Sequence, residues 1–497
     1  MKQKTKTVTP NIALQSWLRP ALTVVGANKD YAEFRQMLES VDGLLRGSHL
    51  EAMAMDFAKE GAGEVSFVQL RNRMEFALKA LRFEVLRMLL GNMSFRKLSR
   101  SIAASDLLAD FCGVRTLEGI HGVSKSVLER AAKFFTAEQV RWMGQVFVEM
   151  CGEPDRASEL GLSAALATDV CLIDGTCLEA NIHFPVDWVL LRDVSKTLLK
   201  AMILIRRAGL RHRMPEEPEC FARQMNKLCM AMTHARRRSD PMRTRKQILR
   251  QMKQLLRTIG EHARRHRDLL EQKYSQTPYS QRQAKRIIAR VDAMLVQLGA
   301  VIKQAHERII GGRPVANEEK ILSVHERDVN VLLRGKAGSN VEFGNSLLLS
   351  EAPSGLITDW QLYQGAAPAE WRQLEESLAR QNRFDLSAPI SAVGTDRGFA
   401  TKKTAAMLRQ QDVYDAVCPR DPCELTERLS EKRFAQLQRR RSATEARIAI
   451  IKQRHGGRLR CKGFANRYRS VGWSVLGHNL WLVSRLLAEE IILKRAA

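Results

Sequence analysis

The stretch from Val170 to Thr176 constrains the fold of this chain more than any other. It is apolar as far as Ile173 and then changes abruptly to Asp174 and Gly175. A short apolar run bounded by turn-forming residues is typical of a strand buried in a sheet. We therefore expect a sheet-containing core in which this strand ends at Asp174, where a rigidly held carboxylate still reaches solvent.

A second apolar stretch, Pro389–Thr395, also ends in an acid, Asp396. A single acid after a strand is most often only part of a turn, so the pair is more informative than either one. Strands and helices alternate around both, which predicts a mixed α/β layer fold. Further strands are expected over 340–350, 356–363 and 413–418, and helices over 368–382, 401–411, 434–455 and 473–494.

Positive charge is concentrated between the two acids. The net charge of the chain is +26, and residues 201–300 hold 23 Lys or Arg against 8 Asp or Glu. Apolar residues recur there at helical spacing, so we expect a long basic helical hairpin inserted between strands. Such an excess favours a polyanionic partner over a merely solvated face, and we expect Arg236, Arg237 and Arg238 to contact phosphate. A bilayer is a weaker candidate, because no apolar run reaches the roughly 18 residues that span one.

The N-terminal third is expected to be all α-helical. Apolar residues recur at helical steps from Phe67 to Leu90, and a short basic helix follows Ser94. Short basic helices joined by tight turns favour a DNA-binding region over an ordinary packing domain. The predicted organisation is a DNA-binding region (1–160), a first core segment (161–195), the basic helical insertion (196–320) and the rest of the core with a C-terminal helix (321–497).

Cysteine usage and the N-terminus indicate a cytoplasmic protein. Most of the nine cysteines lie in apolar runs, as expected of reduced, buried thiols. Cys418 and Cys423 form a close pair, but no second Cys/His pair at zinc spacing accompanies them, so we expect no zinc site. Basic residues near the N-terminus are not followed by the apolar core of a signal peptide.

A third acid, Glu445, lies in the predicted helix 434–455. Residues of this helix that step by three or four share one face, which mixes apolar and charged side chains. They are Phe434, Leu437, Arg441, Glu445, Ile448 and Lys452. Arg441 and Glu445 are i,i+4 partners in the middle of this face, where a solvated ion pair is not expected. The pattern favours a carboxylate directed at a site, with Arg441 and Lys452 near phosphate.

Three carboxylates suit metal-dependent cleavage of a phosphodiester. Two divalent ions about 4 Å apart can activate the attacking oxygen and stabilise the leaving one. Mg²⁺ prefers oxygen ligands and keeps several waters. We therefore expect Asp174, Asp396 and Glu445 to bind Mg²⁺, with Mn²⁺ as a possible substitute.

The chain resembles DDE transposases of bacterial insertion sequences, the cut-and-paste enzymes with a ribonuclease H-like catalytic core. Three blocks in a fixed order carry the resemblance. They are Asp174-Gly175-Thr176 with Glu179–Ile182 and Pro185-Val186-Asp187; Gly335–Gly338 with Val341–Gly344 and Thr395–Phe399; and Arg441–Glu445 with Lys452, Gly463 and His478-Asn479-Leu480.

The resemblance implies a ribonuclease H-like core and a role for each matched residue. Asp174, Asp396 and Glu445 are the implied catalytic and metal-binding triad. Arg441 and Lys452 are implied contacts to terminal phosphates, and Lys336 is a further implied DNA contact. Gln438 stands where related groups carry a tyrosine, which leaves a tyrosine contact to DNA without a counterpart.

The resemblance also implies partners and a location. The partners would be double-stranded DNA, both as transposon ends and as target, and a second copy of the chain in a homodimer. A nucleoid-associated protein of the bacterial cytoplasm is expected. Two alternatives stay open: a catalytically inactive DNA-binding derivative, and a ribonuclease H-like nuclease acting on structured nucleic acid.

Overall fold

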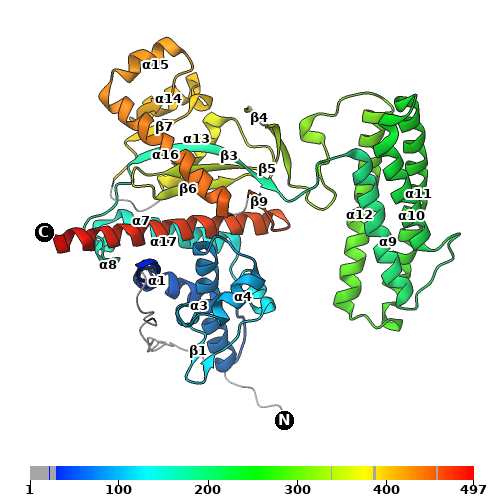
Figure 1. Ribbon diagram of the computed structural model, residues 1–497, viewed down its shortest axis with the longest axis horizontal. Helices are drawn as coiled ribbons and strands as arrows, with labels where there is room; N and C mark the ends of the chain where they lie inside the picture. The colour runs from blue at the N-terminus through cyan, green and yellow to red at the C-terminus, as the bar shows by residue number, and fades with distance from the viewer. Residues whose placement is uncertain (1–21, 23–28, 337–338, 384–387, 455–456, 497) are drawn as a thin grey trace. The chain divides into compact units, whose positions relative to one another are not determined.

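A computed structural model describes residues 22, 29–336, 339–383, 388–454 and 457–496 (Figure 1). The chain forms two compact units. Unit 1 combines Met1–Glu179 with Asn345–Ala497, and unit 2 is Ala180–Gly344. Unit 2 is therefore wider than the insertion expected at 196–320.

The first part of unit 1 is helical, and its helices pack with the last helix of the chain around one apolar core. The helices are α1 (Lys29–Gly47), α2 (Leu50–Glu60), α3 (Phe67–Leu89), α4 (Phe95–Ala103), α5 (Asp106–Phe111), α6 (Lys125–Ala131), α7 (Ala137–Gly152), α8 (Pro154–Glu159) and α17 (Phe464–Ala496). The predicted helix ending at Leu90 is confirmed as α3. The region is not all-α, however, because an antiparallel hairpin of β1 (Arg115–Thr116) and β2 (Gly119–Ile120) lies between α5 and α6.

The sheet of unit 1 is mixed. β3 pairs in parallel with β7 and β7 with β8, whereas β5 and β6 form an antiparallel pair. β3 lies between β5 and β7, and β9 also pairs with β3. The strands are β3 (Val170–Ala180), β5 (Ser339–Glu351), β6 (Ile357–Leu362), β7 (Ala392–Thr395), β8 (Tyr414–Val417) and β9 (Arg458–Leu459).

Helices cover both faces of this sheet, so its strands are apolar on both sides. Leu348 packs on one face with α13 (Glu370–Gln381) and α14 (Lys402–Gln410). Its neighbours Leu347 and Leu349 pack on the other face with α16 (Lys432–Arg454) and α17. The opposite placement of successive leucines follows from the two-residue period of a strand.

The predicted mixed α/β class is confirmed, and so are the strands expected at 340–350, 356–363 and 413–418. The C-terminal helix begins at Phe464, not Trp473, and the short helices α15 (Pro422–Leu429) and η4 (Arg397–Phe399) were not expected. None of the helices in the described ranges combines the length and apolar character needed to cross a bilayer.

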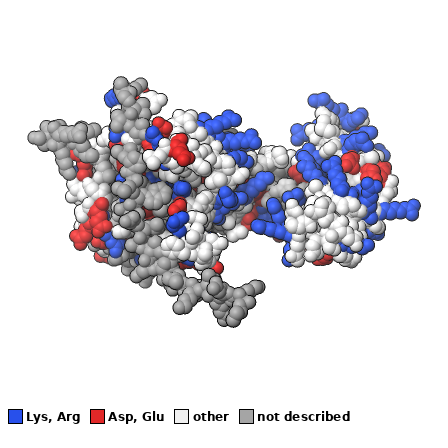
Figure 2. Space-filling model, turned by 90° about the horizontal axis from the view of Figure 1, so that it is seen from below, with Lys and Arg blue, Asp and Glu red and all other residues white. Residues whose placement is uncertain are grey.

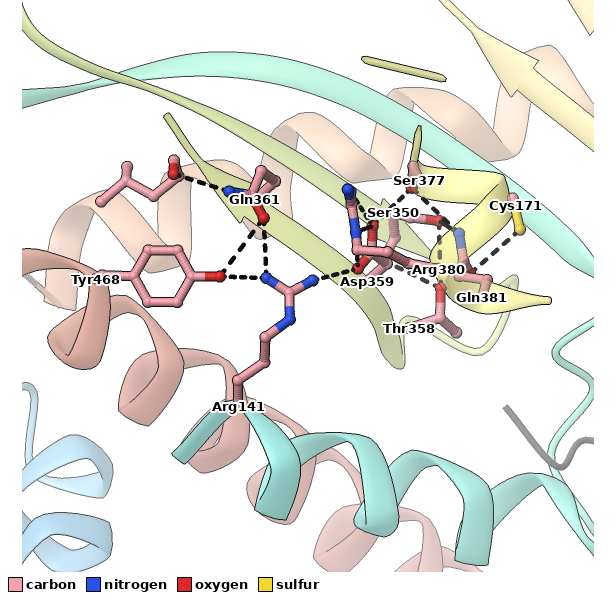
Figure 3. A network of polar contacts seen from close by, with 11 residues as sticks. Arg141, Cys171, Ser350, Thr358, Asp359, Gln361, Ser377, Arg380, Gln381 and Tyr468 are labelled. Carbon is pink, nitrogen blue, oxygen red and sulfur yellow. Dashed lines mark hydrogen bonds and ion pairs between the residues drawn. The ribbon is translucent and has the colours of Figure 1, made fainter. Parts of the chain in front are cut away.

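A buried polar network joins α7 and α13 to the sheet (Figure 3). At its centre the carboxylate of Asp359, on β6, accepts hydrogen bonds from Arg141 (2.9 Å), Arg380 (2.7 Å) and Ser377 (2.7 Å). Arg141 also donates to Gln361 on the same strand at 3.0 Å. The side chain of Asp359 is only 1 % exposed, so its charge is neutralised by the two arginines instead of by water.

Unit 2 contains four long helices in its described part, not the hairpin that the sequence suggested. The elements are α9 (Asp187–Arg207), α10 (Pro218–His234), η1 (Ala235–Arg237), α11 (Pro241–Lys273), η2 (Tyr274–Gln276), α12 (Gln281–Ile309), η3 (Asn317–Glu319) and β4 (Asn330–Lys336), which pairs with the start of β5. Pro218 and Pro241 each stand in the first turn of a helix, where a missing N–H costs nothing. The four helices share one apolar core.

Candidate active site

The parallel pairing of β3 and β7 places Asp174 beside Asp396. Leu172 is in register with Gly394, and each acid comes two residues later along the chain. Asp396 directly follows β7 and lies close enough to Asp174 to raise its pKa. The strand does not end at Asp174 as predicted: β3 runs on to Ala180, whereas β7 stops at Thr395. Asp174 is solvent-accessible because its neighbour is the shorter strand.

The other two predicted acids, Asp396 and Glu445, act electrostatically on Asp174. Burial raises the pKa of Asp174, and the neighbouring carboxylates of Asp396 and Glu445 raise it further. The backbone N–H of Gly175 and the guanidinium of Arg441 act in the opposite direction on this pKa. The acids predicted from three separate parts of the sequence therefore lie within electrostatic range of Asp174.

Backbone groups hold one oxygen of each aspartate. Asp174 Oδ1 accepts from the N–H of Gly175 at 2.7 Å, and Asp396 Oδ1 accepts from the N–H of Gly398 at 3.0 Å. Within the described ranges, the structure gives the Oδ2 atoms of these residues no hydrogen-bond partner. Each aspartate thus has a fixed orientation and a second oxygen available for a ligand.

Gln438 fixes α16 against the end of the sheet. Its Nε2 donates to the carbonyl oxygens of Thr395 (3.1 Å) and Ala416 (2.5 Å), where β7 and β8 end. Its Oε1 accepts from Nε of Arg441 at 3.1 Å. The residue that replaces the expected tyrosine therefore links the strand before Asp396 to Arg441.

The predicted ion pair between Arg441 and Glu445 is not formed. Arg441 is bonded to Gln438 instead, and Glu445 is exposed. The buried side of α16 runs through Phe434, Thr444, Ile448 and Ile451, so Glu445 lies beside this stripe and not within it. The predicted face shares Phe434 and Ile448 with the buried side, but Glu445 lies outside it and is exposed to solvent.

Glu351 orients the same helix from inside. Its buried side chain accepts a hydrogen bond from Thr444 Oγ1 at 3.0 Å and lies 3.3 Å from Nε of Arg447. Burial raises the pKa of Glu351, and Arg447 counteracts that rise. Because Thr444 is tied inward, the next residue, Glu445, projects from a different side of α16.

A fourth acid that sequence analysis missed, Glu370, lies next to Asp396. It is the first residue of α13, and a Cβ added at Gly398 would come within 2.7 Å of its Oε1. Burial and then Asp396 raise the pKa of Glu370. A side chain at position 398 would push this carboxylate aside, so the glycine lets Glu370 approach Asp396. No local pattern around residue 370 distinguishes this acid from an ordinary helix-start glutamate.

The remaining predicted residues are basic. Lys452 is half-buried on α16. Arg236, Arg237 and Arg238 are exposed at the junction of α10 and α11, in unit 2. Lys336 ends β4, also in unit 2, and its side chain lies outside the described residues, as do Ala337 and Gly338 of the same sequence block.

The carboxylates match magnesium in chemistry, but they are not gathered into a ready coordination shell. Among the described residues, no group of three or more His, Cys, Asp or Glu side chains is arranged to hold a metal ion. Asp174 and Asp396 nevertheless offer hard oxygen donors side by side. Mg²⁺ commonly uses only one or two carboxylates, with waters and substrate phosphate completing its shell. These two residues fit such a site.

We expect Asp174→Asn to raise the free energy of unfolding at pH 7 in the presence of EDTA. A carboxyl whose pKa is higher in the folded than in the unfolded state is destabilising when ionised. This penalty is full above the folded pKa and disappears as pH falls below the ordinary value of about 4. Urea unfolding of the variant and the wild type across this pH range should show that the variant's gain in free energy of unfolding becomes smaller as the pH falls. A variant less stable than wild type at pH 7 would contradict the crowding of the acids.

Comparison of the chain with protein-family models, with curated proteins and with solved structures found no match.

Proposed function

We propose that this protein is a DNA transposase that binds the terminal inverted repeats of an insertion sequence and cuts and joins DNA with divalent metal ions. The observation that carries the proposal is the convergence of Asp174 and Asp396, with Glu445 and Arg441 within electrostatic range. Residues more than 200 positions apart rarely bring like charges together in a half-buried site without a function that needs them.

The chain's own residues suggest a division of roles. Asp174 and Asp396 would hold the Mg²⁺ ions, and Glu445 would join them from α16. When bound, such ions supply an activated water or hydroxyl nucleophile and stabilise the leaving oxygen. Arg441, held by Gln438, would orient a phosphate of the cleaved strand, and Lys452 on the same helix would contact the DNA further along.

A ribonuclease H-like core is part of the proposal. In support, the sheet is mixed, helices cover both faces, and Asp174 lies on β3 while Asp396 directly follows β7, the parallel neighbour of β3. The proposed partners are double-stranded DNA and a second copy of the chain.

The test is a strand-transfer assay. Purified protein is incubated with a plasmid that carries the ends of its element, with Mg²⁺ or with EDTA, and the products are sequenced. Mg²⁺-dependent cuts at the ends together with joined products support a transposase. Cuts without joined products indicate the second candidate, a ribonuclease H-like nuclease, and binding without cleavage indicates an inactive derivative.

We expect replacement of Arg236, Arg237 and Arg238 by alanine to flatten the salt dependence of DNA binding. Each phosphate that the protein no longer neutralises lowers the slope of log affinity against log salt by about 0.9, so removal of three cations corresponds to roughly 2.7. Fluorescence anisotropy over a range of KCl concentrations measures the slope. An unchanged slope would mean that these exposed arginines face only water.

A further inference from the structure

Four arginines form a straight row along α11. Arg243, Arg250, Arg257 and Arg264 are all exposed and follow one another at intervals of seven residues. Seven residues advance a helix by about 10.5 Å and rotate it by only about 20°. The row therefore stays on one side of the helix for about 31 Å. Figure 2 shows Lys and Arg side chains gathered over the bundle that contains it.

Lysines lie in two of the three intervals of the row. Lys253 lies close enough to Arg250 and Arg257 that both, after burial, lower its pKa. Lys246 occupies the equivalent place between Arg243 and Arg250, whereas Gly260 stands between Arg257 and Arg264. We call this row of positive side chains the α11 ridge: Arg243, Lys246, Arg250, Lys253, Arg257 and Arg264.

The charge of the four arginines is not compensated within the described part of the chain. The structure gives none of their side chains an ion pair or a hydrogen bond, although Glu261 is also exposed on α11. Arg267, three residues beyond the row, differs sharply. It pairs with three carboxylates, those of Asp268, Glu271 and Asp292. Carboxylates of neighbouring residues therefore neutralise Arg267 but not the four arginines of the row.

We infer that the α11 ridge binds the phosphate backbone of double-stranded DNA over about one helical turn. A turn of B-DNA is about 34 Å long, close to the length of the row, and a duplex presents a phosphate charge every 1.7 Å or so along its axis. A rigid helix with regularly spaced guanidinium groups suits a rigid polyanion. No base is read, so the contact is independent of sequence.

A membrane surface fits the ridge less well. A helix that lies in a lipid interface needs an apolar face directed at the bilayer. The apolar face of α11, which includes Leu249, Met252 and Leu256, is buried in the core of unit 2. What the helix presents outward is mostly polar and charged, with Met242 near its start as an exposed apolar side chain.

The test measures DNA binding by the full-length protein in EDTA. Its partner is taken from the proposed function, but binding without metal does not depend on cleavage. The probe is a duplex of about 30 base pairs, roughly three turns, of arbitrary sequence. R250Q/R257Q is expected to lower the slope of log affinity against log salt by about 1.8, since two phosphates are then no longer neutralised. R250K/R257K, which keeps the charges, should retain most of the slope.

The matched control is R313Q/R485Q, which removes the same net charge. Each of these arginines is paired with a surface carboxylate, Glu307 or Glu489, so its replacement should leave the slope unchanged. An equal fall in both double variants, or none in either, would overturn the inference. So would binding of phosphatidylserine vesicles without binding of the duplex, whereas duplex binding without vesicle binding supports the inference. The two proposals can fail separately. If the ridge does not bind DNA, the cleavage assay still tests the proposed function. If no cleavage occurs, the salt slope of DNA binding still tests the ridge.

Discussion

Asp174→Asn, Asp396→Asn and Glu445→Gln should each reduce Mg²⁺-dependent DNA cleavage by at least about a thousandfold. Metal ions contribute several kcal/mol to stabilising the transition state of phosphoryl transfer, and about 4 kcal/mol corresponds to three orders of magnitude in rate. Each substitution keeps the shape of the side chain and removes a charged oxygen ligand. Single-turnover cleavage of an end-bearing duplex is the measurement.

Stability separates this loss of activity from misfolding. Asp174→Asn is expected to be more stable than wild type at neutral pH, so an inactive variant that melts at a higher temperature would have lost chemistry and not structure. Glu489→Gln, which removes an exposed acid of α17 paired with Arg485, is the charge-matched control and should cleave normally. Near-normal cleavage by all three site variants would refute the proposed function.

Asp359→Ala should destabilise the protein by about 3–5 kcal/mol, the usual result when one partner of a buried ion pair is removed. Arg141 and Arg380 would be left largely buried without a counter-charge, and Ser377 would lose its acceptor (Figure 3). The midpoint of urea unfolding reports the change. Asp359→Asn keeps the shape and part of the hydrogen bonding, so it should destabilise the protein less.

The control for this effect is again Glu489→Gln. Its ion pair with Arg485 is more than half exposed on both sides, and exposed pairs contribute only about 0–1 kcal/mol. If Asp359→Ala cost no more than this control, α7 and α13 would have to be held to the sheet by apolar packing alone.

Much of the sheet could be predicted because its strands carry local signals. Leu347–Leu349 and Val393 are buried on both sides of the sheet, so the apolar runs stand out in sequence. The end of β3 could not be predicted. Residues after Asp174 continue the strand through pairing with other strands, and such pairing leaves no mark on the local composition.

The sequence pointed to three acids of the candidate site, but not to Glu370 and not to the residues that orient these acids. Gln438 acts through carbonyl groups of Thr395 and Ala416, residues that lie far from it in sequence. Glu351 acts through Thr444 across 93 positions. A helix pattern shows which residues share a side, but not which distant groups that side will meet.

The sequence of the basic insertion contains signals for helix starts that its high density of positive charge led us to overlook. Pro218 and Pro241 mark two helix starts, and Ser280 with Gln283 forms a capping box at the start of α12. These three starts imply several helices in succession, whereas the density of arginine suggested one hairpin. The seven-residue spacing of Arg250 and Arg257 places both on one side of α11, but that this side is exposed is known only once the buried side of the helix is known.

Unit 2 is joined to the rest of the chain through β3 and β5, which are neighbours in the sheet. Its two ends therefore leave the sheet on neighbouring strands. A segment attached in this way can be lengthened, shortened or exchanged without rethreading the strands around it.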